Sequence, residues 1–238
     1  MPASSLPANL DRVREQIARA AERAGRRADE ITLVAVSKTL PVAAIRAAYE
    51  AGLRHFGENR VQEFESKQPA LAGLDAAWHM IGHLQTNKAR RAAHLFNRVD
   101  SVEQLSLAQK LDSAAAAEGK RIPILIEVHL GDEAAKSGVA EPDLPSFADA
   151  IAPLAHLDLL GLMTIPPYFD DAARVRPFFA KLRVLRDDLS RRLARPLPVL
   201  SMGMSHDFEI ATEEGATEIR VGTALFGERH TIAETSEP

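Results

Sequence analysis

The chain has 238 residues, of which 46% are hydrophobic and 26% charged, an ordinary globular composition that can bury one large core. Its 29 basic and 33 acidic residues leave a formal net charge of -4, which attracts neither polyphosphate backbones nor anionic lipid, so no nucleic acid or membrane partner is expected. The chain has no cysteine, which excludes disulfides and thiolate metal sites, and it shows no apolar signal segment or membrane-spanning run, so a cytoplasmic protein is predicted.

The first predicted element is an amphipathic helix over residues 6–24, where apolar residues recur at helical spacing up to Gly25. After it, short apolar runs alternate with longer segments of helical period. The runs predicted to be strands are ITLVAV (31–36), RHFGEN (54–59), WHMIG (78–82), LFNRVD (95–100), PILIEVH (123–129), LDLLGLMT (157–164), PVLSMGM (198–204) and EIRVGT (218–223). Helices are predicted over 41–51, from about 60, and over 102–118, 144–154, 170–193 and 207–215, with Asp170 or Asp171 capping the longest.

This alternation predicts an α/β fold, a single (β/α)8 TIM barrel with an extra N-terminal helix. We take residues 1–238 as one domain, with its core at about residues 5–229. An open doubly wound sheet is the alternative, but the first strand–helix turn lacks the G-x-G-x-x-G of dinucleotide sites. Barrel sites lie at the C-terminal ends of the strands, so the residues that follow each run are the candidates.

Lys38 lies just beyond the first predicted strand, at the expected mouth of the barrel. A lysine at a strand end can simply reach into solvent. It can also form an imine with an aldehyde, because an apolar strand end favours the neutral amine. The second and third strands end near Asn59 and His83, so we expect both side chains at the same mouth.

Small and hydroxyl-bearing residues follow the last two predicted strands. Barrels often bind a phosphate between these two loops, through backbone N–H groups and the start of a short helix. Ser205, Gly222 and Thr223 supply hydroxyl groups and close backbone approach there, and Met204 lies in the same turn. A phosphate site together with an imine-forming lysine predicts a phosphorylated aldehyde, and pyridoxal 5′-phosphate (PLP) fits.

Arg220 lies two residues before Gly222 on the last predicted strand, so both face the inside of the barrel. A guanidinium opposite the pyridine nitrogen of PLP would donate a hydrogen bond and keep that nitrogen unprotonated. The ring would then be a poor electron sink. One alternative needs no cofactor: Lys38 as the imine-forming lysine of an aldolase that acts on a phosphorylated sugar.

The runs ITLVAVSKT, HFGENRVQE, WHMIGHLQTNK, KSG (136–138), GLMTIPP, MGMSHD and EIRVGTALFG occur together in this order. Together they resemble the pyridoxal phosphate homeostasis protein family, also called the proline synthetase co-transcribed homologue family, from the N-terminal helix to about Arg229. The resemblance implies a PLP fold-type III barrel like the N-terminal domain of alanine racemase. His129, where an Asn is expected, and Glu228 depart from the family pattern.

The resemblance also implies roles for single residues. Lys38 would carry PLP as a Schiff base, and Ser205, Gly222 and Thr223 would hold the phosphate. Arg220 would face the pyridine nitrogen, and Asn59 would lie beside the cofactor. The full set of residues expected to bind PLP is Lys38, Asn59, His83, Met204, Ser205, Arg220, Gly222 and Thr223.

Members of that family are regarded as carriers or regulators of PLP without established catalysis. We therefore expect PLP homeostasis, with no catalytic residue and no metal, apo PLP-dependent enzymes as recipients, and a monomer or weak dimer. The alternative is a PLP-dependent racemase or decarboxylase of fold type III. Such enzymes resemble this chain but add a β-rich domain with a base opposite the lysine, whereas only 15 residues follow Thr223.

Three further patterns carry weaker predictions. The letters SHD at 205–207 spell a triad, but consecutive side chains point in different directions and cannot form the relay. His79 and His83 are four residues apart in a strand region, and a zinc site is not expected there. Lys136 of the KSG motif is our hypothesis for a second lysine that receives the aldehyde during transfer.

Overall fold

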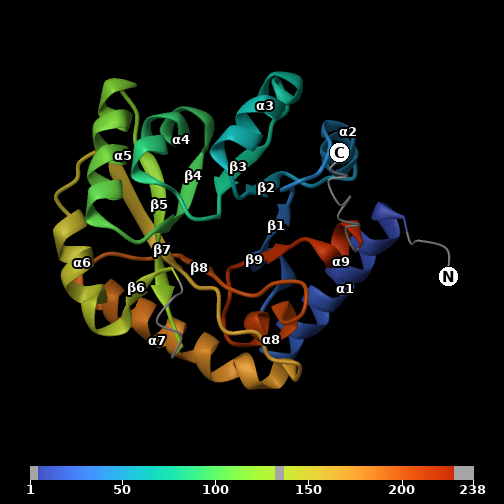
Figure 1. Cartoon of the computed structure of the whole chain (residues 1–238). Coiled ribbons are helices and arrows are strands. Elements are labelled where there is room, and N and C mark those ends of the chain that lie inside the picture. The colour runs from blue at the N-terminus through green and yellow to red at the C-terminus, as the bar shows by residue number, and fades with distance from the viewer. Residues whose placement is uncertain (1–4, 132–136, 228–238) are drawn as a thin grey trace, which may run out of the picture.

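A computed structural model describes residues 5–131 and 137–227, which form a parallel β-barrel wrapped by helices (Figure 1). The strands of the barrel are β1 (Thr32–Val36), β2 (His55–Glu58), β3 (Ala77–Met80), β4 (Arg98–Val102), β5 (Ile122–His129), β7 (Leu157–Met163), β8 (Val199–Ser201) and β9 (Glu218–Val221). Every neighbouring pair is parallel, in the order β4-β3-β2-β1-β9-β8-β7-β5, and β5 pairs back onto β4. The sheet is therefore closed, and the predicted (β/α)8 TIM barrel is confirmed.

The register of the strands decides which loops meet at the mouth. Val36 lies level with Gly57 of β2, and Ala35 lies level with Val221 of β9. The loops after β2, β1 and β9 therefore begin at one height on neighbouring strands. A two-residue strand that was not predicted, β6 (Val139–Ala140), pairs with the end of β5.

The helices cover the outside of the barrel (Figure 1). They are α1 (Leu6–Arg23), α2 (Val42–Glu50), α3 (Val61–Leu71), α4 (Ala89–Leu95), α5 (Leu105–Ala117), α6 (Leu144–Ile151), α7 (Arg176–Arg192), α8 (Phe208–Glu213) and α9 (Thr223–Phe226). Short 3-10 turns are η1 (Ala28–Glu30), η2 (Thr86–Lys88), η3 (Glu141–Asp143) and η4 (Ala172–Val175). Among the described residues, none of these helices has both the length and the apolar character needed to cross a membrane.

The N-terminal helix α1 packs along α8 and α9 on the side of the barrel. Asn9 is buried there and donates a hydrogen bond through Nδ2 to the carbonyl of Leu225, at 2.9 Å. At the other end of α1, Arg23 pairs with Glu209 and Glu213 of α8. The extra helix thus joins the first and last parts of the fold.

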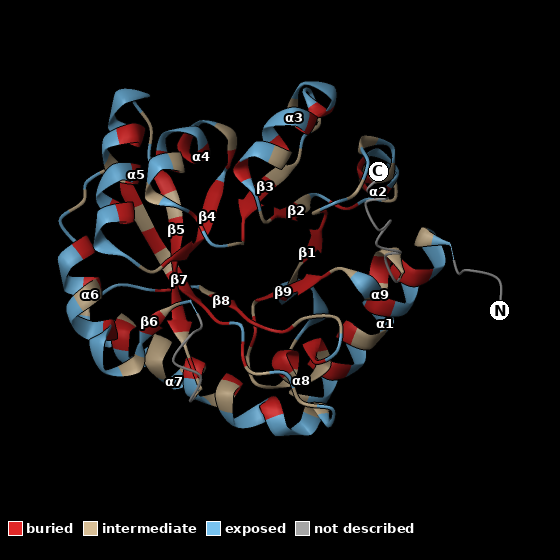
Figure 2. Cartoon of the chain, in the orientation of Figure 1, coloured by how far each residue is buried: buried red, intermediate tan, exposed pale blue. Residues whose placement is uncertain are grey.

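Alternation along the strands separates an outer core from the barrel interior. Ile124, Ile126 and Val128 of β5 pack in the apolar core shared with the helices, so Leu125 and Glu127 face inward. Figure 2 shows the same division, with buried strands and with helices that are buried on their inner faces only. The outer layer holds most of the apolar burial, and the interior also carries charged side chains.

The fourth predicted strand was placed too early in the chain. It was expected over 95–100, but β4 runs from Arg98 to Val102, and α5 begins at Leu105 rather than at 102. The apolar pair Leu95 and Phe96 that suggested a strand closes α4 instead, and Phe96 is buried against the helices. The long helix was expected from residue 170, but α7 begins at Arg176, and the predicted cap Asp171 instead caps the 3-10 turn η4 before it, where its Oδ1 accepts from the Ala173 N–H.

Candidate functional site

Lys38 lies two residues past the end of β1, and its side chain is half-buried. Ser37 before it is fully buried, and its N–H donates to the Gly57 carbonyl of β2 at 2.9 Å. The β-sheet pairing therefore continues one residue beyond β1, and the lysine projects from a fixed point. Asn59 lies two residues past Gly57, so it stands beside Lys38 on the neighbouring strand end.

A buried ion-pair network supports the turn that carries Lys38. Lys67 of α3 donates through Nζ to Glu58 Oε1 at 3.2 Å and to Glu63 Oε1 at 2.6 Å. It also donates to the Ser37 carbonyl, and the Ser37 hydroxyl donates to Glu58 Oε1. The Thr39 N–H is bound by Glu63, and Thr39 has a φ of 62°, a conformation that costs a non-glycine residue free energy. The network therefore holds a strained turn next to Lys38.

Burial raises the pKa of Glu58, although Lys67 and the Ser37 hydroxyl oppose this effect. The pKa of Glu63 is lowered, because its bonds to Lys67 and to the Thr39 N–H outweigh its partial burial. The two carboxylates thus share one buried cation. None of this was predicted from the sequence, where Glu58 and Lys67 belong to separate elements.

Ser205, after β8, is bound to the loop after β9. Its Oγ accepts hydrogen bonds from the N–H groups of Gly222 (3.1 Å) and Ala224 (3.2 Å). A hydroxyl has two acceptor positions and one donor, so the O–H hydrogen of Ser205 stays available for an anion. Thr223 is exposed at the start of α9, between the two N–H groups that point to Ser205. The predicted phosphate residues are therefore brought together.

The turn that holds Ser205 is fixed at both ends. The Met204 N–H donates to Asp207 Oδ1 at 2.6 Å, and the Phe208 N–H donates to the Met204 carbonyl. Gly203 before it has a φ of +92°, and a Cβ there would lie 2.5 Å from the Ala211 Cβ. Only glycine allows β8 to end this close to α8.

The three residues of the SHD letters point to three different partners. Ser205 binds the loop after β9, His206 Nε2 lies 3.1 Å from the Phe169 carbonyl, and Asp207 caps the Met204 N–H. No relay forms among the three residues. The dismissal of a triad is confirmed.

Arg220 of β9 is 3% exposed and points into the barrel. Its Nη1 donates to the Ser201 hydroxyl at 2.7 Å, and its Nη2 donates to the Thr164 carbonyl at 2.8 Å. Both partners are neutral, and no ion pair with any described residue reaches this guanidinium. Burial lowers the pKa of Arg220, while Glu218, Asp100, Glu127 and Asp207 raise it from a distance. A buried cation held only by neutral acceptors is costly, which indicates a function.

Glu127 is a buried carboxyl at the same level of the barrel, and it was not among the residues predicted from the sequence. It is 4% exposed, and it lies level with Met163, next to the Thr164 that binds Arg220. Burial and the nearby Glu103 raise the pKa of Glu127 to about 7, against the lowering effect of Arg220. A lone acid at an inward position of the apolar run PILIEVH is the signal that could have found it.

His83 is exposed, and its Nδ1 lies 2.7 Å from Glu103 Oε1 in the loop after β4. Glu103 also accepts the N–H of Gly138 and so ties the residues before β6 to the mouth. Because a helix was predicted over 102–118, the position of Glu103 at the mouth and its pairing with His83 were not expected. His83 lies over β3, across the barrel from Ser205 over β8.

Asn59 and His83 line a cavity of about 290 Å³ outside the ends of β2 and β3. The backbone at Gly82 passes close to Asn59, and only glycine fits there, since a Cβ would lie 2.6 Å from the Asn59 carbonyl oxygen. His79, in contrast, is 3% exposed inside the barrel. The two histidines considered for zinc thus lie in different environments.

The lower interior of the barrel holds a second set of charges. Arg98 forms ion pairs with Asp100 and Glu218, all of them buried. His79, Asp100 and Glu218 present ligand atoms within 4.8 Å of one another, as a cation would require. Arg98 already supplies the positive charge at both carboxylates, so we assign this group a structural role.

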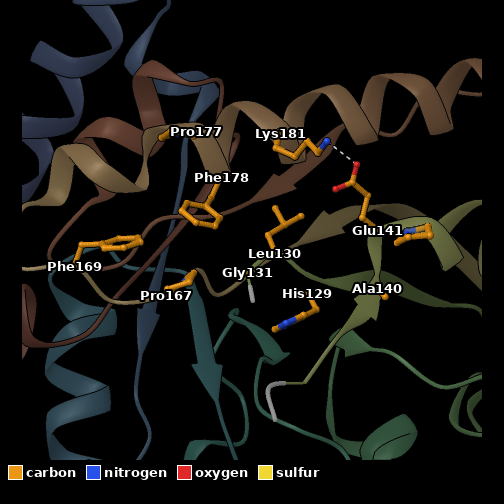
Figure 3. A pocket seen from close by; sticks show the side chains of 11 residues that line it. His129, Leu130, Gly131, Ala140, Glu141, Pro167, Phe169, Pro177, Phe178 and Lys181 are labelled. Atoms are coloured by element: carbon orange, nitrogen blue, oxygen red, sulfur yellow. Dashed lines mark ion pairs between the residues drawn. The ribbon is translucent and has the colours of Figure 1, made fainter. Parts of the chain in front are cut away.

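A cavity of about 710 Å³ opens beside the mouth, between the ends of β5 and β6 and the start of α7 (Figure 3). His129, one of the two departures from the family pattern, lines it together with Phe169 and Phe178. Lys181 and Glu141 form an ion pair at its edge, at 2.6 Å. Two other predictions, on Lys136 and Glu228, lie outside the described residues.

Comparisons with known proteins match nearly the whole chain. The family model described as "Alanine racemase, N-terminal domain" matches residues 8–230. Curated relatives named "Pyridoxal phosphate homeostasis protein" are 48% identical over 92% of this chain and 96% of the relative in Aquifex aeolicus strain VF5, and 46% identical over 95% and 96% in Pseudomonas aeruginosa PAO1.

Solved structures are similar over the same span. PipY of Synechococcus elongatus PCC7942, solved with PLP bound, is 39% identical with a TM-score of 0.83, over 94% of this chain and 100% of PipY. Alanine racemase of Clostridium difficile 630 shares the fold alone, at 15% identity and a TM-score of 0.70, over 96% of this chain and 58% of the racemase. Because the sequence motifs, the barrel and these likenesses coincide, the chain belongs to the pyridoxal phosphate homeostasis protein family, built on the alanine racemase N-terminal domain.

Proposed function

We propose that this chain binds PLP at the mouth of the barrel, holds it as a Schiff base on Lys38, and buffers it or delivers it to apo PLP-dependent enzymes. PLP supplies a reactive aldehyde, and the chain keeps that aldehyde in a reversible linkage. The family supports PLP as the ligand, since relatives are named for PLP homeostasis and PipY was solved with PLP bound.

The observation that carries the proposal is the buried Arg220. Within residues 5–131 and 137–227, its guanidinium binds the neutral Ser201 hydroxyl and the Thr164 carbonyl and no carboxylate. A guanidinium has five N–H donors, so a ligand with a neutral ring nitrogen offers it a further hydrogen-bond acceptor. The donor set at the mouth therefore fits the pyridine end of PLP.

The other end of PLP fits the loops after β8 and β9. The Ser205 hydroxyl, the backbone of Gly222 and the exposed Thr223 offer donors to a phosphate, and Met204 lies in the Ser205 turn. Lys38 follows β1, the strand next to β9, so its amine is expected to reach the aldehyde. Asn59 and His83 are proposed to contact the cofactor from the side of β2 and β3.

Loading the purified protein tests this proposal. Wild type incubated with PLP should turn yellow, and borohydride should fix one pyridoxyl group on Lys38, found by peptide mass spectrometry. Lys38→Ala should lose that label, while Lys181→Ala, on the outer cavity, should keep it. A colourless protein that cleaves a phosphorylated sugar would establish the aldolase alternative instead.

Arg220 has a spectroscopic test of its own. The sequence alone suggests Arg220→Glu, but Glu218, Asp100 and Glu127 already place acids near this position, so a further acid would endanger folding. Arg220→Gln is the cleaner variant. It should shift the visible absorption of the loaded protein, because without the guanidinium the pyridine nitrogen can be protonated. An unaltered spectrum would contradict a role of Arg220 at the ring.

Carrier and enzyme are separated by two assays. Loaded protein mixed with an apo PLP-dependent enzyme should activate it at a rate that free PLP, at its equilibrium concentration, does not reproduce. Incubation with L-alanine should yield no D-alanine, and steady racemisation would favour the racemase alternative. Size-exclusion chromatography of the same samples tests the prediction of a monomer or weak dimer, and cell fractionation tests the predicted cytoplasmic location.

Lys136 stays a prediction for the transfer step. If it receives the aldehyde from Lys38, Lys136→Ala should slow both loading and release of PLP. Stopped-flow absorbance measures both rates. Unchanged rates would remove Lys136 from the pathway.

A further inference from the structure

We propose that Glu127 couples occupation of the mouth by an anionic phosphorylated ligand to the uptake of a proton from solvent. The inference rests on the proposed function, because PLP is taken as the ligand. It concerns a residue to which neither the motifs nor the comparisons assign a role.

The position of Glu127 carries the first step. β1 and β5 lie on opposite sides of the closed ring, so Glu127 faces the mouth from the wall opposite Lys38. Its side chain points inward and is 4% exposed, and its carboxyl makes no hydrogen bond or ion pair with the described residues. Burial destabilises the ionised form of a carboxyl most when no hydrogen bond or ion pair stabilises it, so such a group tends to stay protonated.

The charges around Glu127 set how easily that proton leaves. Glu103, in the loop after β4, opposes ionisation and is itself paired with His83 of the loop after β3. Arg220 of β9 favours ionisation, and Glu218, Asp100 and Asp207 act on Arg220 rather than directly on Glu127. Together with burial these groups bring the pKa of Glu127 to about 7, so the free protein is half-protonated there at neutral pH.

Binding of PLP changes two of these influences in the same direction. Its phosphate brings about 1.5 to 2 negative charges into the mouth at pH 7. Its ring also engages Arg220, which among the described residues is the cation that stabilises the ionised form of Glu127. Both effects favour the neutral acid, so the carboxylate takes one proton from water and becomes a carboxylic acid. By linkage, ligand affinity must then fall as pH rises past neutrality.

The size of the effect follows from a free-protein pKa of about 7. If the carboxyl must be protonated in the complex, the affinity for PLP falls about tenfold between pH 6 and pH 8. It also takes up roughly half a proton per PLP at pH 7 and roughly 0.9 at pH 8. Other titrating groups of PLP and Lys38 contribute equally in wild type and in Glu127 variants, so the difference between proteins isolates Glu127.

Calorimetric titration of the full-length protein with PLP, in two buffers of different ionisation enthalpy, measures this proton uptake. Relative to wild type, Glu127→Gln should lose about half a proton of uptake at pH 7 and the extra tenfold pH dependence of Kd. Glu103→Gln should instead raise uptake at pH 7, because it removes a like charge and Glu127 becomes more fully ionised before binding. Glu141→Gln, beside the outer cavity, should behave as wild type.

Equal proton uptake in wild type and Glu127→Gln would overturn the inference and leave PLP binding intact. A wild type that takes up no PLP would overturn the proposed function itself. If Glu127→Gln does not fold, Glu103→Gln decides, since uptake at pH 7 that does not increase contradicts the coupling.

Discussion

At the scale of single residues, Glu127 makes a prediction for the protein without ligand. Its pKa is raised from the ordinary 4.5 to about 7, so between these two pH values the Glu127 carboxyl is protonated in the folded chain and ionised in the unfolded chain. Stability therefore falls as pH rises through that window and levels off above it. Glu127→Gln cannot ionise, so its free energy of unfolding should exceed that of wild type by on the order of 3 kcal/mol at pH 8 and by less than about 1 kcal/mol at pH 5.

Urea unfolding of both proteins at the two pH values measures this difference. Glu58 also has a raised pKa, so wild-type stability alone does not isolate Glu127. The two profiles should converge toward acid. If they stay parallel from pH 5 to pH 8, Glu127 does not titrate in the folded chain.

The hydroxyl groups of the proposed phosphate site make a second residue-scale prediction. Ser205→Ala and Thr223→Val should each weaken PLP binding by roughly 1–3 kcal/mol, because a bound anion loses a donor. Ser205→Ala also frees the N–H groups of Gly222 and Ala224 that its Oγ now binds. Pyridoxal, which lacks the phosphate, serves as the control ligand, and equal losses for both ligands would mean that the hydroxyls do not bind phosphate.

At the scale of elements, α3 acts on the strand end that carries Lys38. Lys67 compensates the buried Glu58 and binds the Ser37 carbonyl, so Lys67→Met leaves a buried carboxyl without its cation. We expect a loss of about 3–5 kcal/mol in the free energy of unfolding at neutral pH. The loss should shrink in acid, where Glu58 protonates. The exposed Lys181–Glu141 pair is the matched control, and Lys181→Met should cost less than about 1 kcal/mol.

Denaturant titrations of both lysine variants, with and without PLP, test this prediction. A Lys67→Met protein as stable as Lys181→Met would show that the network adds nothing. A variant that is destabilised but binds PLP with unchanged affinity would show that α3 supports the barrel without positioning Lys38.

The sequence patterns predicted the presence of the barrel strands but misplaced one of them. The alternation of apolar runs predicted each barrel strand, and Gly25 correctly marked the end of α1, after Arg23. The fourth strand was displaced because a buried helix end such as Leu95–Phe96 has the same apolar pattern as a strand. This displacement placed Glu103 in a helix and hid its position at the mouth.

At the scale of the whole molecule, ligand binding increases the stability of the folded chain. A ligand that binds only the folded chain stabilises it by about 2.7 kcal/mol when its free concentration is 100 times Kd. We therefore expect the melting temperature of wild type to rise with PLP concentration. Lys38→Ala should lose most of this rise, and calorimetry checks it. Equal rises in both proteins would place the stabilising contacts away from Lys38.

Contacts at both ends of α1 attach it to the last helices of the fold. It binds the carbonyl of Leu225 at one end and pairs with Glu209 and Glu213 at the other. Its amphipathic pattern predicted a helix but not the surface against which it packs. In the structure it joins the ring of helices beside α8 and α9.

The sequence by itself determined the barrel class and the order of its strands, and it predicted Lys38, Ser205, Arg220 and Gly222 as site residues, because hydrophobic period and residue chemistry are local properties of the chain. Only the tertiary structure decided how far each charge is buried and what faces it. The neutral partners of Arg220, the burial of Glu127 and the shared cation Lys67 depend on strands and helices that are distant in sequence. Burial and Coulomb interactions act through space, so their effect on a side chain is fixed only when the barrel closes.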